Sequence, residues 1–326
     1  MNKSFQLEED SNMLYVEMDG RCGNQLFHYA VARYIQLAIG NKEKLCLNFN
    51  KIFEKNDEEN GWIDYLKDFK TVPYNYYSQS GTILKNESNL IQKMAIGLKA
   101  IQIKSLTKKS RQEQADKAEV GQRTLNKLGV YWVREGVNQI YPYKNRKILV
   151  SGICESSFIY QIQEQLQKEL VPVAPVSSFN KLLLEKIDNC NSVCISVRRG
   201  DFFNNKNAKK YGVCSPEYYI RAKKYFDEKK LDDTIYFCFS DDIEWCKENL
   251  KFTDKNVIFV SQEMPVYETL RLMSHCKHFI LSNSTFSWWG QFLSNNTNKI
   301  IISPARWNND GYDTKLIDKN WVLIDA

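Results

Sequence analysis

The sequence lacks any long apolar run. No segment approaches the roughly 18–20 consecutive apolar residues that a helix needs to cross a bilayer, so a membrane-spanning protein is excluded. The opening segment, MNKSFQLEEDSNM, carries acidic residues where a secretion signal has an apolar stretch. We therefore predict a cytoplasmic protein, with peripheral contact at the inner face of the membrane as the one membrane association left open.

Paired cysteines are absent as well. The nine cysteines are odd in number and scattered, which is typical of reduced thiols in the cytosol rather than of a disulfide framework. Cys190 and Cys194 have three residues between them, and His275 and His278 lie near a predicted strand. Both spacings are too irregular for a zinc site. We predict structural roles for these residues and no metal site.

Several well-known motifs are also missing. The chain has neither the dinucleotide fingerprint G-x-G-x-x-G nor a phosphate-binding P-loop, and no histidine accompanies a Gly-x-Ser-x-Gly elbow. Aromatic and basic residues do not alternate as they do in nucleic-acid binders. Ser-His-Asp hydrolysis is therefore unsupported, and nucleic acid is not predicted as a partner.

What is present is the composition of an ordinary globular protein, with 43% hydrophobic and 26% charged residues. A chain of 326 residues exceeds the roughly 250–300 at which single cores stop growing, so two lobes are expected. The net charge of +6 is concentrated between Lys99 and Arg123, where seven basic residues face three acidic ones. The simplest interpretation is a solvated helix face. The alternative is contact with an anionic membrane surface or a lipid pyrophosphate.

The first lobe opens with a strand–helix–strand pattern. The alternating run MLYVEM predicts a strand, and apolar residues at helical spacing then continue to Gly40, a typical helix stop. KLCLNF predicts a second strand. Residues 50–145 are expected to be mostly helical, and RKILVSGI (146–153) indicates another buried strand.

Two prolines and two serines in LVPVAPVSS (170–178) predict a lobe boundary, which divides the chain into residues 1–172 and 173–326. In the second part strands alternate with helices, and this predicts an α/β fold with a doubly wound, largely parallel sheet. The predicted strands are SVCISV, TIYFCFS, NVIFVS, HFILS and KIIIS, and the predicted helices are SPEYYIRAKKYFDEKK, DIEWCKENL, PVYETLRLMSHC and TFSWWGQFLS.

Three polar loops follow these strands directly, at residues 198–201, 240–242 and 282–285. Ligands of doubly wound sheets bind beyond the carboxyl ends of the strands. We therefore expect the three loops to gather at one edge of the sheet and to form one wall of a pocket.

The first loop, in SVRRGDF, places Arg198 and Arg199 directly after a strand. Two adjacent guanidiniums repel each other, but each offers a bidentate and permanently charged contact to a phosphate. A plain polar turn is the alternative. Together with the other loops, the pattern favours a phosphate-binding loop.

The third loop, in SNSTFSWWG, places Asn283, Ser284 and Thr285 where a helix begins. Small hydroxyls and unpaired backbone N–H groups at a helix start form an anion site, whereas capping by Ser284 or Thr285 is the simpler interpretation. Trp288 and Trp289 are predicted to be core residues.

In the second loop, FSDD, Ser240 precedes Asp241 and Asp242. A carboxylate there can accept hydrogen bonds from the N1–H and exocyclic amine of guanine. Capping of the next helix by Asp241 is an equally good interpretation. In the first lobe, GRCGNQLF contains Gly23, which permits close backbone approach. The adjoining Asn24 and Gln25 are either helix caps or amides that reach toward a sugar.

Five segments, taken in order, closely resemble the bacterial members of the α-1,2-fucosyltransferase family: GRCGNQLFHYA, VCISVRRGDF, GVCSPEYY, FSDD and ILSNSTFSWWG. The resemblance spans both lobes and is weak between residues 50 and 145. It implies a GT-B-like α/β protein with two Rossmann-like lobes, residues 1–172 on the acceptor side and residues 173–326 binding the donor. The implied enzyme is inverting and metal-independent.

The resemblance implies transfer of L-fucose from GDP-β-L-fucose to the 2-hydroxyl of a terminal galactoside, in surface glycan or O-antigen synthesis. The acceptor would be a galactose-terminated oligosaccharide or a lipid-linked glycan. One rival is a related transferase with another acceptor linkage or nucleotide sugar. A second is a non-catalytic protein that binds a nucleotide or sugar.

The resemblance also implies roles for single residues. Arg198 would hold the diphosphate and stabilise the departing GDP, and Arg199 would assist or brace the loop through Asp201. Asn24 would contact the donor sugar or phosphate. Asp241 or Asp242 would read guanine, and Ser284 and Thr285 would form the phosphate-binding helix start. The chain departs from the family pattern at Ser196, where the family usually has histidine, and at His28, where it commonly has glutamine.

Three groups are candidates for the base that takes the acceptor proton. Asp201 lies in the arginine loop, although the neighbouring guanidiniums would lower the basicity of its carboxylate. His28 has an unperturbed pKa of about 6.5 but is also interpreted as a packed helix residue. The third candidate is a phosphate oxygen of the donor itself.

Overall fold

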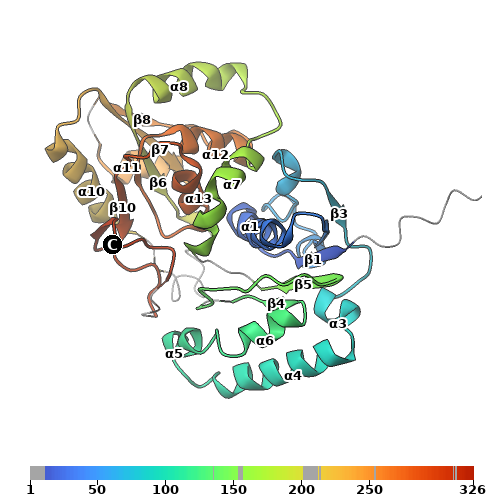
Figure 1. Ribbon diagram of the computed structural model, residues 1–326. Helices are drawn as coiled ribbons and strands as arrows, with labels where there is room; N and C mark the ends of the chain where they lie inside the picture. Colours follow the sequence, from blue (N-terminus) through green and yellow to red (C-terminus); the bar gives the residue numbers. More distant parts are fainter. Residues whose placement is uncertain are drawn as a thin grey trace, which may run out of the picture. The chain divides into compact units, whose positions relative to one another are not determined.

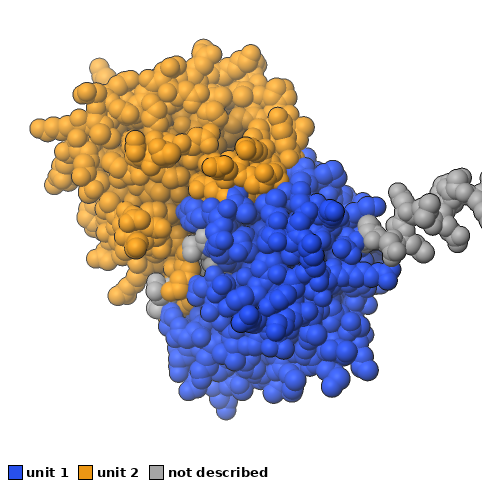
Figure 2. Space-filling view, in the orientation of Figure 1, with its two compact units in different colours: residues 1–67, 71–162 blue, residues 68–70, 163–326 orange. Residues whose placement is uncertain are grey.

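The computed structural model describes residues 12–134, 136–152, 157–200, 212, 214–252, 255–310, 312 and 314–326. The chain forms two compact units, which are coloured separately in Figure 2. Unit 1 comprises Met1–Lys67 and Thr71–Ile162, and unit 2 comprises Asp68–Lys70 and Gln163–Ala326. In the described ranges, no helix combines the length and the apolar character that crossing a membrane requires.

Unit 1 is built on a five-stranded parallel sheet with the order β3-β2-β1-β5-β4. Its strands are β1 (Met13–Glu17), β2 (Lys44–Asn48), β3 (Tyr74–Tyr76), β4 (Val130–Trp132) and β5 (Lys147–Ser151). Its helices are α1 (Cys22–Ile39), α2 (Asn50–Phe53), α3 (Ile83–Glu87), α4 (Leu90–Ser105), α5 (Arg111–Asp116) and α6 (Gln122–Lys127), with the 3-10 helix η2 (Ser157–Ile162). A further 3-10 helix, η1, spans Leu66–Asp68.

Helix α1 is buried along most of its length. It begins after Arg21 and ends at Gly40, which adopts φ 115° and donates its N–H to the carbonyl of Gln36. This left-handed backbone conformation favours glycine. The helix stop predicted at Gly40 is confirmed.

Unit 2 carries a six-stranded parallel sheet with the order β11-β10-β9-β6-β7-β8. Its strands are β6 (Asn191–Val197), β7 (Thr234–Ser240), β8 (Val257–Phe259), β9 (His278–Ile280), β10 (Ile301–Pro304) and β11 (Val322–Ile324). Its helices are α7 (Gln163–Glu169), α8 (Ser178–Asn189), α10 (Pro216–Lys229), α11 (Ile243–Asn249), α12 (Val266–His275) and α13 (Thr285–Leu293).

The sheet of unit 2 is covered on both faces (Figure 1). Helices α10 and α11 pack through Tyr218 and Cys246 on the face that presents Val193 and Ile195 of β6. Helices α8 and α12 pack on the other face, around Cys194. Because β6 leads outward to β7 and β8 and the chain then returns on its other side to β9, the sheet is doubly wound. The predicted α/β fold with parallel sheets is therefore confirmed.

Most elements of unit 2 match the predicted ones within a few residues, including Ser215, whose hydroxyl accepts the N–H of Tyr218 at 3.3 Å and caps α10. The sequence did not predict β3, β4 and β11. Residues 163–172 pack with unit 2, whereas the predicted boundary lay after residue 172. Gln163 of α7 explains the difference, because its side-chain amide donates to the carbonyl of Phe292 in α13 at 2.7 Å.

Candidate functional site

The three predicted loops leave the same edge of the unit 2 sheet. Strands β6 and β7 are in register to their ends, with Val197 opposite Ser240, and β9 pairs with the other side of β6. The chain reverses its direction of winding between β6 and β9. In sheets of this kind the crevice beyond the carboxyl ends at that point is where ligands bind.

Arg198 is held by an ion pair across two of these loops. Its Nη1 lies 2.8 Å from Oδ2 of Asp241, and Oδ1 of the same carboxylate accepts the backbone N–H of Arg199 at 2.9 Å. Gly200 makes room for the pair, because a Cβ at this position would lie 2.5 Å from the Oδ2 atom. The arginine loop and the FSDD loop therefore meet, as the sequence predicted.

Arg199 is braced differently. Its Nε lies 3.3 Å from Oδ2 of Asp242, and its guanidinium carbon sits 3.4 Å from the ring centre of Trp245, in a cation–π contact. Oδ1 of Asp242 accepts the N–H of Trp245 at 3.2 Å and caps α11. The cap is therefore Asp242 and not Asp241, because Asp241 is committed to the arginine loop. The bracing role of Arg199 involves Asp242 and Trp245.

Asp201 lies outside the described residues. Asp241 and Asp242 each engage an arginine and a backbone N–H, yet carboxylate oxygens have further lone pairs to offer. Their reading of guanine stays a prediction. Ser240 closes β7, and its hydroxyl accepts the N–H of Asp242 at 2.9 Å.

Ser196 points into a buried chain of hydroxyls. Its Oγ lies 2.6 Å from that of Ser287 in α13, which in turn lies 2.9 Å from that of Ser282 after β9. All three residues are buried. This chain joins the end of β6 to the start of α13, so it fixes the third loop against the first.

The hydroxyl of Ser284 does not cap the start of α13. Ser284 occupies the N-cap position, but its side chain makes no capping hydrogen bond, and its N–H donates to the carbonyl of Ser282 at 2.8 Å. Thr285 is the first residue of the helix. Capping by Ser284, the simpler interpretation, is therefore wrong, and the anion-site role of Ser284 and Thr285 stays a prediction.

Asn283 is buried, and its amide donates to the carbonyl of Trp307 at 3.1 Å. It therefore anchors the segment that follows β10. Trp288 and Trp289 are fully buried, which confirms them as core residues.

Two positioning residues went unnoticed in the sequence. The hydroxyl of Tyr218 donates to the carbonyl of Leu281 at 2.6 Å, and that of Tyr219 donates to the carbonyl of Ser196 at 3.4 Å. The first turn of α10 thus holds the ends of both β6 and β9. The only signal was the pair of tyrosines directly behind the cap in SPEYY.

In unit 1 the predicted residues surround the start of α1. The side-chain amide of buried Gln25 donates to the carbonyls of Gly20 and Ile63, at 3.0 and 2.8 Å, and its oxygen accepts the N–H of Tyr65 at 3.0 Å. Gln25 therefore fixes the loop geometry. Asn24 is half-buried and packs against Gly20, where any Cβ would collide with the Asn24 side chain. Gly23 is buried in the first turn. The donor contacts of these three residues stay predictions.

His28 is inside unit 1, with only 2% of its surface exposed. Both ring nitrogens are buried and make no hydrogen bond. Burial therefore disfavours the imidazolium and lowers the pKa of His28 to about 4, in spite of an opposing effect of Asp19. This placement favours the interpretation of His28 as a packed helix residue over that of the base.

We expect His28 to make stability depend on pH. Its pKa is about 4 when folded and about 6.5 when unfolded, so between these values the unfolded chain binds more protons and stability falls as the pH falls. At pH 5 this costs about 2 kcal/mol of unfolding free energy. In urea titrations at several pH values, His28→Gln should lose this part of the pH dependence. An unchanged pH dependence would contradict the assignment.

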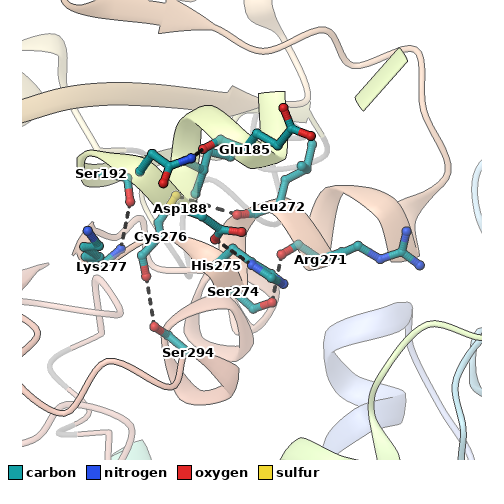
Figure 3. A network of polar contacts seen from close by, with 12 residues as sticks. Glu185, Asp188, Ser192, Arg271, Leu272, Ser274, His275, Cys276, Lys277 and Ser294 are labelled. Atoms are coloured by element: carbon teal, nitrogen blue, oxygen red, sulfur yellow. Dashed lines mark hydrogen bonds and ion pairs between the residues drawn. The ribbon is translucent and has the colours of Figure 1, made fainter. Parts of the chain in front are cut away.

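The two histidines of the HCKH segment have structural partners. Figure 3 shows Nδ1 of His275 facing Oδ1 of Asp188, at 2.8 Å. Nδ1 of His278 accepts the N–H of Ile300 at 3.0 Å. Within the ranges that the structure describes, no three His, Cys, Asp or Glu side chains gather as metal ligands. The predicted structural roles of the two histidines are confirmed.

Known proteins resemble about half of this chain. The chain is 35% identical over 161 residues to an α-1,2-colitosyltransferase of Escherichia coli, covering 46% of the chain and 52% of that protein. It is 33% identical over 169 residues to the O-antigen biosynthesis glycosyltransferase WbnK of Escherichia coli, covering 51% of the chain and 53% of that protein. The chain thus spans about half the length of these relatives.

The structure aligns over 87% of the chain with 93% of the crystal structure of the fucosyltransferase NodZ from Bradyrhizobium, with a TM-score of 0.46 and 12% sequence identity. The sequence profile of glycosyl transferase family 11 matches residues 151–325, which include the whole arginine loop and the start of α13. This match covers more than half of the chain. The chain therefore belongs to glycosyl transferase family 11.

Proposed function

We propose that this protein is an inverting galactoside α-1,2-fucosyltransferase that uses GDP-β-L-fucose. The observation that carries the proposal is the ion pair between Arg198 and Asp241 beyond the carboxyl ends of β6 and β7, within a chain of glycosyl transferase family 11. Unit 2 would bind the donor and unit 1 the acceptor, a terminal galactoside of an oligosaccharide or lipid-linked glycan, in O-antigen or other surface glycan synthesis.

The proposed mechanism rests on charge that develops at the leaving group. As the bond from fucose to GDP breaks through an oxocarbenium-like transition state, negative charge grows on the diphosphate, while an acceptor hydroxyl attacks the opposite face of the sugar. Arg198 and the backbone N–H groups at the start of α13 would bind this charge more tightly in the transition state than in the ground state. Asp241 keeps Arg198 oriented before the donor arrives.

A screen of donors against acceptors, with linkage analysis of the product, tests the proposal. GDP-fucose should be consumed with galactosides and give an α-1,2 linkage, whereas GDP-mannose should not react. A second candidate sugar is colitose, because a relative at 35% identity is named an α-1,2-colitosyltransferase. Preferential use of a colitose donor would favour that rival. Turnover of any donor would dismiss a purely binding protein.

We expect the activity to survive EDTA. Arginine and helix N–H groups suffice to neutralise the leaving diphosphate in this proposal, so no step depends on a divalent cation. Activity is measured after chelation and again after manganese or magnesium is added. Loss of activity in EDTA that either cation restores would contradict the proposed chemistry.

Asp201→Asn should separate a base from a structural residue. If Asp201 takes the acceptor proton, the variant binds GDP normally and loses turnover by about 100-fold or more, the usual scale of general-base loss. His28→Gln is the matched comparison, because the burial of His28 predicts little loss of turnover. A joint fall in GDP affinity and turnover would assign Asp201 to the arginines instead.

A further inference from the structure

Helix α4 carries most of its large apolar side chains on the outside, although Ile96 packs against the core of unit 1. Five of them are between 64% and 75% exposed, and we call this set the outer face of α4. It consists of Leu90, Ile91, Met94, Leu98 and Ile101. In Figure 1, α4 lies at the periphery of unit 1, beside α6. A contiguous exposed apolar surface of this kind marks an interaction site.

The packed side of the same helix is partly polar, and its polar groups are satisfied. Nζ of buried Lys99 donates to the carbonyls of Ala118 and Val120, at 2.9 and 2.6 Å. The amide of buried Gln92 donates to the carbonyl of Leu128 at 2.8 Å and completes a capping box with Asn89. These contacts fix the rotation of α4 about its axis. If the helix rotated to bury its exposed apolar side chains, the ammonium of Lys99 and the amide of Gln92 would lose these hydrogen-bond partners.

The surroundings of the outer face are positively charged. Between residues 88 and 112 the chain has no acidic residue and six basic ones, of which only Lys99 is buried. Exposed Lys93 and Lys104 are separated by about three helical turns, so they lie along one border of the outer face, and exposed Lys108 follows the helix. An apolar helix face bordered by lysines is typical of helices that lie in the plane of a membrane interface.

We propose that α4 docks its outer face on an anionic lipid surface. Charge decides between this occupant and a second copy of the chain: in a dimer through α4 the lysine borders would meet with no acidic partner, whereas anionic headgroups attract them. The proposal relocates the membrane contact that the sequence suggested for residues 99–123, since Lys99 is buried. It does not depend on the proposed sugar transfer.

Vesicle co-sedimentation of the full chain tests the proposal. We expect binding to vesicles with about 30% anionic phospholipid, at least about tenfold weaker binding to neutral vesicles, and weaker binding at about 0.5 M than at about 0.05 M NaCl. Absence of binding, or equal binding to neutral and anionic vesicles, would overturn it.

Variants assign the contact to the outer face. Met94→Ser, Leu98→Ser and Ile101→Ser combined should weaken vesicle binding by at least about tenfold. The matched control combines Phe179→Ser and Leu182→Ser on α8, two side chains that are each 76% exposed, and should bind like the parent. Circular dichroism confirms folding. Equal losses in both variants would refute the assignment to α4.

Two further measurements keep the inference separate from the proposed function. The α4 variant should turn over a water-soluble acceptor at the parent rate, because none of its changes lies at the sheet edge of unit 2. Sedimentation of the parent chain should show a monomer. A dimer that the α4 variant abolishes would identify a second copy as the occupant and overturn the lipid proposal.

Discussion

Lysine in place of Arg198 is expected to reduce turnover by about 100- to 1000-fold, which corresponds to the 2.7–4 kcal/mol that one donor to a developing oxyanion typically contributes. The substitution keeps the positive charge and removes the planar fork. Nη1 of Arg198 already lies 2.8 Å from Asp241. A guanidinium has further N–H groups for a phosphate in a fixed direction, whereas one ammonium cannot reproduce both contacts in that geometry.

The measurements are the turnover of GDP-fucose and the affinity for GDP, each on protein whose folding has been checked. The control is Arg123→Lys, the same chemical change at an exposed arginine of unit 1 whose Nε contacts the hydroxyl of Tyr143 at 3.4 Å. Its turnover should stay near that of the parent. Near-parental turnover of Arg198→Lys would remove Arg198 from the proposed role.

Arg271→Met is expected to lower the free energy of unfolding by about 3–5 kcal/mol, the usual cost of leaving one partner of a buried ion pair alone. Nη1 of Arg271 lies 2.6 Å from Oε2 of Glu268, with side chains only 8% and 3% exposed. Nη2 donates to the carbonyl of Ala174. On the other side, Oε1 of Glu268 accepts from the amide of Asn180 at 3.2 Å.

The pair therefore connects the segment before α8 to α12. Removal of Arg271 leaves the carboxylate of Glu268 buried without its cationic partner. Urea unfolding measures the effect. Adding Glu268→Gln to Arg271→Met should restore much of the stability, because the amide keeps an oxygen for Asn180 and carries no charge. A double variant no more stable than Arg271→Met would show that packing, and not an unpaired charge, sets the loss.

A matched exposed pair provides the control. Lys247 and Glu244 on α11 have the same spacing of three residues and lie 2.7 Å apart, but both are exposed. Water solvates each charge when the other is removed, so Lys247→Met should cost less than about 1 kcal/mol. Similar losses at both pairs would mean that burial does not govern the difference.

Local patterns alone predicted much of unit 2. Ser215 and Pro216 mark the start of α10, and TIYFCFS coincides with β7, because caps and apolar periodicity act within one turn or one strand. Strands β3 and β4 lie within residues 50–145 and carry no such signal. They form only because neighbouring strands offer them hydrogen-bonding partners.

The sequence by itself determined that Arg198 and Asp241 would reach one edge of a sheet, because parallel strands end together. Only the tertiary structure decided that they pair, that Asp242 is the cap, and that His28 is buried. The apolar residues of α4 could equally have faced the core. Lys99 and Gln92 of α4 instead donate hydrogen bonds to carbonyls that are distant in the sequence, those of Ala118, Val120 and Leu128. These bonds fix the rotation of the helix, because a buried ammonium or amide must have hydrogen-bond partners.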